Sequence, residues 1–255
     1  MPFSFLNCMK RFSALLVCVL LGVLLASTRA WAGPDTRPYH EEVTAFLKKY
    51  TAADGAVNYR AVQANPAALR ALLSRTATFD AAAAPPAARK AFYLNAYNVL
   101  VIGAVVDAYP VASVMKVPGF FDQKTYVVAG ERLTLNALET DKLRKPYRDP
   151  RIHFALVCGA KGCPPLSPDA YAPATVEDQL ARQARRALQD PRFVRPDAPS
   201  KKVLLSEIFK WYAADFEASG KALLAYLNQF RGAQPLPLTY AIDYYPYDWA
   251  LNERR

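Results

Sequence analysis

The 255-residue sequence is poor in the side chains that most often hold metal ions, with four cysteines and two histidines. Cys8 and Cys18 lie in an apolar N-terminal segment, so only Cys158 and Cys163 remain for the rest of the chain. One histidine with two cysteines at this spacing falls short of the four ligands of a structural zinc site. The sequence therefore predicts no metal site and no cofactor.

The sequence also lacks the patterns of nucleic-acid-binding proteins. Lys and Arg outnumber Asp and Glu by 32 to 22, a balance that suits nucleic acid or an anionic surface. However, the basic residues are interspersed with acids on helical faces. No helix-turn-helix pattern, zinc-finger spacing or aromatic ribonucleoprotein motif accompanies them. We expect a solvated basic surface and no nucleic-acid partner.

The N-terminal segment carries the features of a signal peptide. Lys10 and Arg11 precede an uncharged apolar stretch over 15–26, and Ala30-Trp31-Ala32 supplies small residues at positions −3 and −1. The apolar stretch is shorter than the roughly 18 to 20 residues that span a bilayer. We expect residues 1–32 to be a signal peptide that is cleaved after Ala32.

No internal repeat and no long Gly/Ser-rich linker divides the remaining sequence, so residues 33–255 are expected to form a single domain. No later stretch is long and apolar enough to replace the signal segment, and we expect no stable membrane span after cleavage. The predicted localisation is periplasmic or secreted. Because that compartment is oxidising, Cys158 and Cys163 are candidates for a disulfide.

The hydrophobic pattern predicts mainly helices with a few short strands. Residues 87–108 are apolar nearly all round, which predicts a central, buried helix. The fold class is therefore α+β, a helix-rich single domain with a small, mostly antiparallel sheet. Helices are expected over 40–50, 87–108, 175–189 and 221–230 and after Asn65, Leu135 and Ser206; strands are expected over 152–157, 203–205 and 238–244 and as a hairpin over 124–135.

Residues 151–166 contain the side chains best suited to chemistry. Cys158 follows an apolar run and precedes a Gly-Ala-Lys-Gly loop, a setting in which Lys161 and loop N–H groups lower the pKa of a thiol nucleophile. The alternative is a Cys158–Cys163 disulfide that closes a four-residue loop, which contributes roughly 2 kcal/mol to stability.

His153 and Glu139 are the candidates for a general base and for the acid that orients it. If residues 152–157 form a strand, the separation of five places His153 and Cys158 on opposite faces, unless the strand ends early or bulges. A buried histidine bonded to backbone is the alternative. Glu139 also fits a capping box with Asn136, which accounts for it without catalysis.

Asn95 and Asn98 stand three residues apart on one face of the most apolar helix. Burying an amide without a partner costs roughly 1 to 3 kcal/mol, so a loop, an ordered water or a ligand must bond to each. They are candidates for lining a site and holding a substrate carbonyl or an oxyanion. The alternative is a structural polar network.

Four motifs of the sequence are Tyr93-Leu94-Asn95-Ala96-Tyr97-Asn98, residues 149–166, Ile208-Phe209-Lys210-Trp211-Tyr212 with Asp215-Phe216, and Tyr247-Asp248-Trp249-Ala250-Leu251-Asn252. With these motifs the sequence resembles the exported bacterial members of the DUF547 family. The resemblance spans most of residues 40–252. In this pattern the positions of Asn95, Asn98, Glu139, His153 and Cys158 fit the family, whereas relatives can carry another residue at the position of Cys163, which argues against an obligatory disulfide. The family is a domain of unknown function and implies no substrate.

Two classes of function are compatible with these residues. The first is a cysteine-dependent hydrolase or acyl-transfer-like enzyme in which Cys158 is the nucleophile, His153 the base and Glu139 the orienting acid. In it Asn95, Asn98 and Lys161 would bind a small-molecule or peptide ligand. The second is a non-enzymatic periplasmic binding or scaffold domain with a Cys158–Cys163 disulfide. Thiol redox chemistry is a third possibility, although the pair lacks the two-residue spacing of the usual redox motif.

Overall fold

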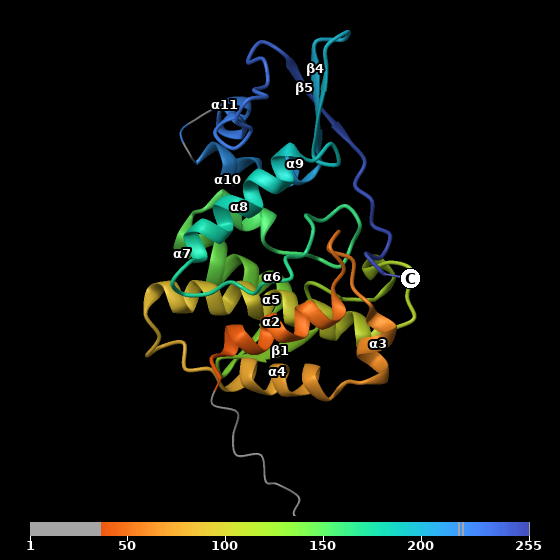
Figure 1. Cartoon of the computed structure of the whole chain (residues 1–255), viewed down its shortest axis with the longest axis vertical. Coiled ribbons are helices and arrows are strands. Elements are labelled where there is room, and N and C mark those ends of the chain that lie inside the picture. The colour runs from red at the N-terminus through yellow and green to blue at the C-terminus, as the bar shows by residue number, and fades with distance from the viewer. Residues whose placement is uncertain (1–36, 219, 221, 255) are drawn as a thin grey trace, which may run out of the picture. The chain divides into compact units, whose positions relative to one another are not determined.

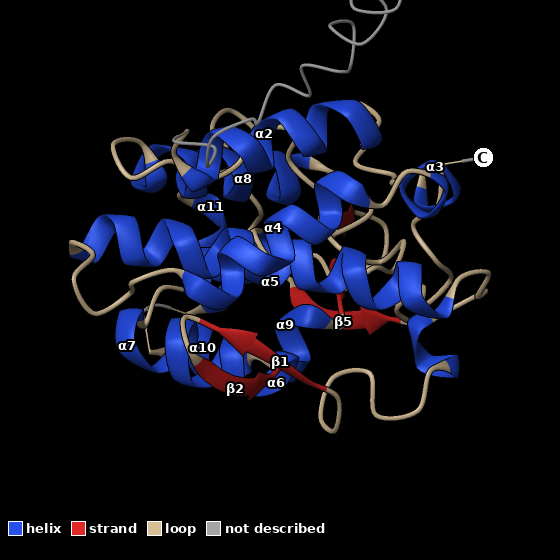
Figure 2. Ribbon diagram, turned by 90° about the horizontal axis from the view of Figure 1, so that it is seen from below, coloured by secondary structure: helices blue, strands red, loops and turns tan. Residues whose placement is uncertain are grey.

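The structure is a computed structural model that describes residues 37–218, 220 and 222–254. Arg37–Arg255 form one compact unit, while the expected signal peptide, residues 1–32, and its cleavage point lie outside the described residues. Helices dominate this unit and the strands form two small sheets (Figures 1 and 2), which confirms the α+β fold class.

Helix α5 (Pro86–Ala108) is the centre of the fold, and α2 (Tyr39–Tyr50), α3 (Tyr59–Ala64) and α4 (Ala67–Thr78) pack against it. Pro86 starts the helix, where a missing N–H costs no hydrogen bond. Every residue over 90–106 is buried, as the apolar pattern predicted. Among the described residues, α5 alone is long and apolar enough to cross a membrane, contrary to expectation, but most of it is buried inside the fold.

The predicted hairpin is confirmed. Strands β1 (Thr125–Val128) and β2 (Glu131–Thr134) pair antiparallel, and the two turn residues, Ala129 and Gly130, both have positive φ (49° and 80°). Two positive φ values are what a two-residue hairpin turn requires. The turn is fixed to α4, because its two N–H groups donate to the carbonyl groups of Thr76 and Ala77 at 2.9 and 2.8 Å.

Short helical turns connect the hairpin to residues 158–163, the loop that contains both cysteines and is called the thiol loop below. The cap of the first turn is Thr134, whose Oγ1 accepts from the N–H of Ala137 at 3.1 Å, so the predicted capping box of Asn136 and Glu139 is wrong. Glu139 lies instead within a π-helical turn. The turns are α6 (Leu135–Ala137), the π-helix η2 (Leu138–Arg144), α7 (Lys145–Tyr147) and the 3₁₀-helix η3 (Pro150–Phe154); another 3₁₀ turn, η1 (Val114–Lys116), precedes the hairpin.

The predicted strand over 152–157 is also wrong, because η3 occupies its first half and irregular backbone follows. A short buried run of apolar and β-branched residues does not distinguish a strand from a buried helical turn. Here Pro150 starts the turn and the Asp149 carboxylate accepts from the N–H of Arg151 at 3.1 Å, which caps it. The argument that His153 and Cys158 point to opposite faces therefore does not apply.

The second half of the chain contains α8 and a three-stranded sheet. Helix α8 (Val176–Gln189) agrees with its prediction. In the sheet, β4 (Lys202–Ser206) pairs antiparallel with β3 (Val194–Asp197), which the sequence analysis missed, and parallel with β5 (Ala241–Tyr245). The parallel pairing needs a crossover, which α9 (Ile208–Trp211), α10 (Ala213–Glu217) and α11 (Leu223–Asn228) supply. Figure 1 shows β4, β5 and α11 at one end and α4 at the other.

Candidate active site

The position of His153 is set by a charge cluster that anchors η3. Lys90 of α5 donates to Asp149 at 2.8 Å and to Glu177 of α8 at 2.9 Å. Arg151 also donates to Asp149, from Nε at 2.8 Å and from Nη2 at 2.7 Å. These contacts tie η3 to two helices, so His153 sits on a rigid turn.

The imidazole of His153 is buried and held by an acid that the sequence analysis did not select. Its Nε2 lies 2.7 Å from Oδ2 of Asp215 in α10, and its ring stacks on Tyr212, with ring centres 3.8 Å apart. The same Asp215 oxygen accepts from Nε of Arg144 at 2.7 Å. Asp215, not Glu139, is thus the carboxylate bonded to His153.

The ionisation of Asp215 fixes which nitrogen of His153 carries the proton. The hydrogen bond from His153, assisted by Arg144 and opposed by burial, lowers the pKa of the Asp215 carboxyl well below its usual range. An ionised carboxylate only accepts hydrogen bonds, so Nε2 of His153 must donate. With Nε2 donating to Asp215, Nδ1 is the nitrogen that can accept a proton when His153 acts as a general base.

The two cysteines are free thiols grouped around the hydroxyl of Tyr247. That hydroxyl lies 3.2 Å from Sγ of Cys158 and donates to Sγ of Cys163 at 3.0 Å. The backbone N–H of Cys158 also donates to Sγ of Cys163, at 3.0 Å. Cys158 and Cys163, both among the described residues, form no disulfide in the structure, although both contact the hydroxyl of Tyr247.

Of the two thiols, Cys163 is the one whose ionised form is stabilised by hydrogen bonds. Burial raises the pKa of its thiol, but bonds from the Cys158 thiol, from Tyr247 and from the N–H groups of Ala160 and Cys158 outweigh burial and lower it. The bond to Cys163, together with burial, raises the pKa of Cys158 well above its usual value. The pair therefore loses one proton readily and the second with difficulty.

Gly162 lets the aromatic ring of Tyr247 approach the thiol loop. A methyl group at Gly162 would lie 2.8 Å from two carbons of the Tyr247 ring, closer than real contacts allow. The loop is fastened to the same C-terminal segment, because the N–H groups of Lys161 and Gly162 donate to the carbonyl groups of Ala250 and Asp248 at 2.7 and 2.8 Å. The loop and Tyr247 form one tightly fitted unit.

His153, Cys158 and Glu139 line one cavity of about 240 Å³. The buried Glu139 accepts a hydrogen bond from the hydroxyl of Tyr212, and this bond together with burial raises the pKa of that hydroxyl. Most other walls are aromatic or apolar, which is typical of small-molecule sites. The cavity is lined by Tyr97, Phe121, Asn136, Glu139, His153, Leu156, Cys158, Cys163, Pro164, Ile208, Trp211, Tyr212, Tyr247 and Trp249.

Asn95 and Asn98 are not among the residues that line this cavity, and their amides are bonded to backbone. Asn95 exchanges two hydrogen bonds of 2.8 Å with the N–H and carbonyl of Tyr171. Asn98 accepts from the N–H of Val157 at 2.9 Å and donates to the carbonyl of Ala155 at 3.0 Å. They form the structural polar network that was the alternative to a ligand site. Lys161 is exposed and also lies outside the cavity wall.

Several residues of the site were missed as functional candidates. Asp215 is 62 residues from His153 and Tyr247 is 89 residues from Cys158, so no local pattern connects them. Both lie in motifs that carry the family resemblance, which was the one available signal. Among the described residues, no group of three or more His, Cys, Asp or Glu side chains is placed to hold a metal ion.

The comparison with protein families covers two of the four motifs, those at 93–98 and 149–166. Residues 82–187, which contain His153 and both cysteines, match the family described as "Protein of unknown function, DUF547". This segment belongs to the DUF547 family. The family prediction is thus confirmed, and the DUF547 match ends before Asp215 and Tyr247. Comparison with curated proteins and with solved structures gave no significant match.

Proposed function

We propose that the protein is a cysteine-dependent hydrolase or acyl-transfer enzyme that acts on a small-molecule or peptide ligand. The observation that supports this function best is that Cys158 and His153 line the same cavity, while Nε2 of His153 is bonded to the carboxylate of Asp215. A nucleophile, a base and an acid that orients the base are the parts that covalent acyl transfer requires.

In the proposed reaction, Nδ1 of His153 takes the proton of the Cys158 thiol as its sulfur attacks a carbonyl carbon. The new S–C bond displaces an amine or alcohol, which receives that proton from His153. Water or a second acceptor then attacks the thioester, with His153 again acting as base, and releases the acid or the transferred acyl group together with free Cys158. Asp215 orients His153, the role first assigned to Glu139. Glu139 instead holds the hydroxyl of Tyr212, on which His153 stacks.

Cys163 and Tyr247 complete the proposed site. A Cys163 thiolate accepts a hydrogen bond from the Cys158 thiol, which favours the protonated form of Cys158 before the reaction starts. The aromatic wall of the cavity suits an uncharged or apolar group next to the carbonyl. The expected export after Ala32 remains part of the proposal, and N-terminal sequencing of protein from the cell envelope checks it.

The decisive experiment compares Cys158→Ser with Cys163→Ser. We expect Cys158→Ser to abolish hydrolysis of an activated ester such as p-nitrophenyl acetate, with little change in melting temperature. Cys163→Ser should retain hydrolysis. Thiols should be counted on native and denatured protein in parallel.

The scaffold alternative predicts a different result. If the cysteines form a structural disulfide, both serine variants lose similar stability, because each opens the same small loop. Equal melting losses, together with no free thiol in exported wild-type protein, would exclude the cysteine enzyme.

A further inference from the structure

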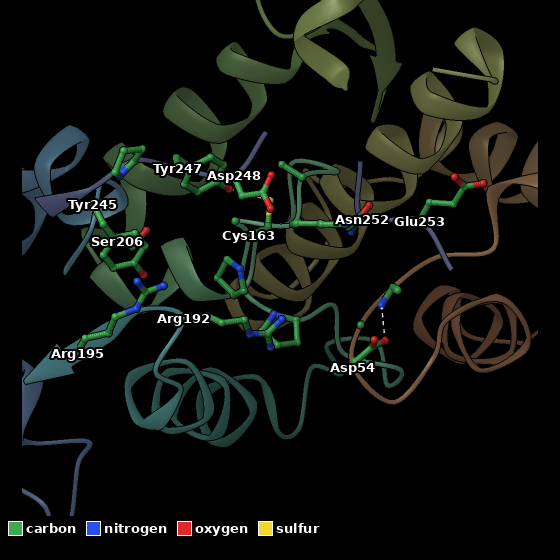
Figure 3. Close-up of a pocket in the computed structure, with 18 residues that line it drawn as sticks. Asp54, Cys163, Arg192, Arg195, Ser206, Tyr245, Tyr247, Asp248, Asn252 and Glu253 are labelled. Carbon is green, nitrogen blue, oxygen red and sulfur yellow. Dashed lines mark hydrogen bonds between the residues drawn. The ribbon is translucent and has the colours of Figure 1, made fainter. Parts of the chain in front are cut away.

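A second, larger cavity of about 510 Å³ adjoins the candidate active site. Cys163, Pro164 and Tyr247 line both cavities, so they form a common wall. The chain segments around the larger cavity come from four parts of the sequence: the loop after α2, the thiol loop, the start of β3 with the end of β4, and residues 245–253 (Figure 3).

The larger cavity differs from the smaller one in carrying three cations and three anions. In Figure 3, Arg192 and Arg195 lie on one side of the cavity, and Asp54 and Glu253 lie on the other. Lys161 and Asp248 complete the set. Within the described part of the chain, no cation of this set comes within 4.0 Å of an anion of the set to form an ion pair.

The arginines are held in place by contacts that leave other N–H groups available. Arg195 donates from Nε to the carbonyl of Pro191 at 2.7 Å, and its guanidinium lies 4.0 Å from the ring centre of Tyr245. Arg192 donates from Nε and Nη2 to Asp190 at 2.9 and 2.7 Å. Each guanidinium has five N–H donors in a fixed fork, so both retain donors for a carboxylate.

A buried amide adds a polar group to the same cavity. Asn252 is only 9% exposed, and its Oδ1 accepts from the hydroxyl of Tyr59 at 2.6 Å. That bond leaves the NH2 group of the amide as a further donor beside the cavity. An amide NH2 group can donate to a carbonyl or carboxylate oxygen of a ligand.

We propose that this cavity is a binding site for a zwitterion with an ammonium and a carboxylate group, and that its ligand is a short peptide with free termini. The carboxylate binds Arg192 and Arg195, and the ammonium binds Asp54 and Glu253. This site is separate from the reaction proposed for Cys158 and does not depend on it.

The balance of charges excludes the simpler ligand classes. An apolar ligand would remove water from six ionised groups without replacing their bonds. A plain anion would meet three carboxylates, and a plain cation would meet three basic groups, which opposes binding of either. A ligand with a carboxylate at one end and an ammonium at the other can bind the arginines and the acids at the same time. The cavity volume lies within the usual range for small-molecule sites.

Titration calorimetry of the purified protein with trialanine tests the proposal. Trialanine with both termini free is compared with trialanine acetylated at the amine, amidated at the carboxylate, or capped at both ends. Free alanine distinguishes an amino-acid ligand from a peptide. We expect capping both ends to raise the Kd at least about tenfold, as loss of charge-assisted hydrogen bonds does.

Variants should act on one end of the peptide only. Arg195→Gln should weaken binding of peptides with a free carboxylate roughly tenfold and leave the amidated peptide unchanged, and Asp54→Asn should do the same for peptides with a free amine. Asp54 is exposed, so its replacement does not threaten folding. Arg185→Gln and Asp178→Asn, on exposed positions of α8, are the matched controls and should change nothing.

The proposal is overturned if capped and uncapped peptides bind equally, if the controls weaken binding as much as the cavity variants, or if no peptide binds at about 10 mM. A cavity variant that melts early is replaced by Arg195→Lys, which keeps the charge and should retain binding of the free carboxylate. Loss of ester hydrolysis in Cys158→Ser with unchanged peptide binding separates this site from the proposed enzyme activity.

Discussion

The buried polar residues on α5 and those on η3 and the loop after it satisfy their hydrogen-bonding groups in different ways. Asn95 and Asn98 each exchange a pair of hydrogen bonds with backbone, and neither is among the residues that line the cavity of Cys158. Nε2 of His153 has a fixed partner in Asp215, and both His153 and Cys158 line a cavity. Burial and polarity alone therefore do not mark a reactive residue; an unused bonding position that faces open space does.

The largest effect expected from this contrast is the loss of reactivity in His153→Ala. Without Nδ1 the Cys158 thiol has no base, and general-base loss typically costs 10²- to 10⁴-fold in rate. Ester hydrolysis is measured at fixed pH, with melting temperature as the check on folding. His40→Ala, on α2, is the matched control and should leave the rate unchanged. An unchanged rate in His153→Ala would show that Cys158 reacts without this base.

Asp215→Asn should reduce hydrolysis by roughly 10²-fold, because the amide no longer holds the His153 tautomer that leaves Nδ1 free. It should also change the pH dependence of unfolding. The pKa of Asp215 is lowered in the fold, so its contribution is full above the ordinary aspartate pKa of about 4 and is lost as pH falls through the lower folded value. The stability difference between wild type and variant should shrink in acid. A difference that grows in acid contradicts the assignment.

Asn98→Ala should give the opposite result from the two preceding variants. It leaves the buried N–H of Val157 and the carbonyl of Ala155 without their partner, so the free energy of unfolding should fall by about 2 to 4 kcal/mol. Hydrolysis by the protein that remains folded should be largely retained. Urea unfolding measures the loss, and Asn65→Ala, at an exposed position, should change stability by less than about 0.5 kcal/mol.

Gly162→Ala should have a smaller effect on stability, and it tests whether the packing of Tyr247 on Gly162 controls the reactivity of the two thiols. The added methyl group pushes the ring of Tyr247 from the loop, at a cost of about 1 to 3 kcal/mol. The Tyr247 hydroxyl then no longer reaches both sulfurs, and the rate of iodoacetamide labelling should change in the direction seen for Tyr247→Phe. Gly103→Ala is the control, because its added methyl would meet only Leu73 at 3.5 Å, an ordinary contact. Opposite changes in the Gly162 and Tyr247 variants would refute the link.

Sequence patterns located most of the helices of this fold because their apolar periodicity and proline boundaries are local features. The hairpin at 125–134 was also predictable from its turn. The pattern over 152–157 misled because a buried 3₁₀ turn and a buried strand share the same composition. Strand β3 contains Pro196 and is mostly exposed, so it has no strand-like alternation.

Only the residues of the site that lie close together in the sequence could be predicted. His153, Cys158 and Cys163 stand in one segment, whereas the partner of His153 depends on how α10 packs on η3. Glu139 was chosen because it was the nearest acid in the sequence, but Asp215 is nearer in space. The family motifs contained Asp215 and Tyr247 without stating their roles.

Tyr247 follows Cys158 by 89 residues, and this separation sets the order of events while the chain is made. At ordinary rates of synthesis the tyrosine emerges on the order of 10 s after the cysteine. During that interval Cys158 and Cys163 lack the hydroxyl that later bridges them, and their loop lacks the residues 248–250 to which it is fastened. The nascent chain therefore exposes two adjacent thiols to oxidants and to other cysteines before the ring of Tyr247 covers them.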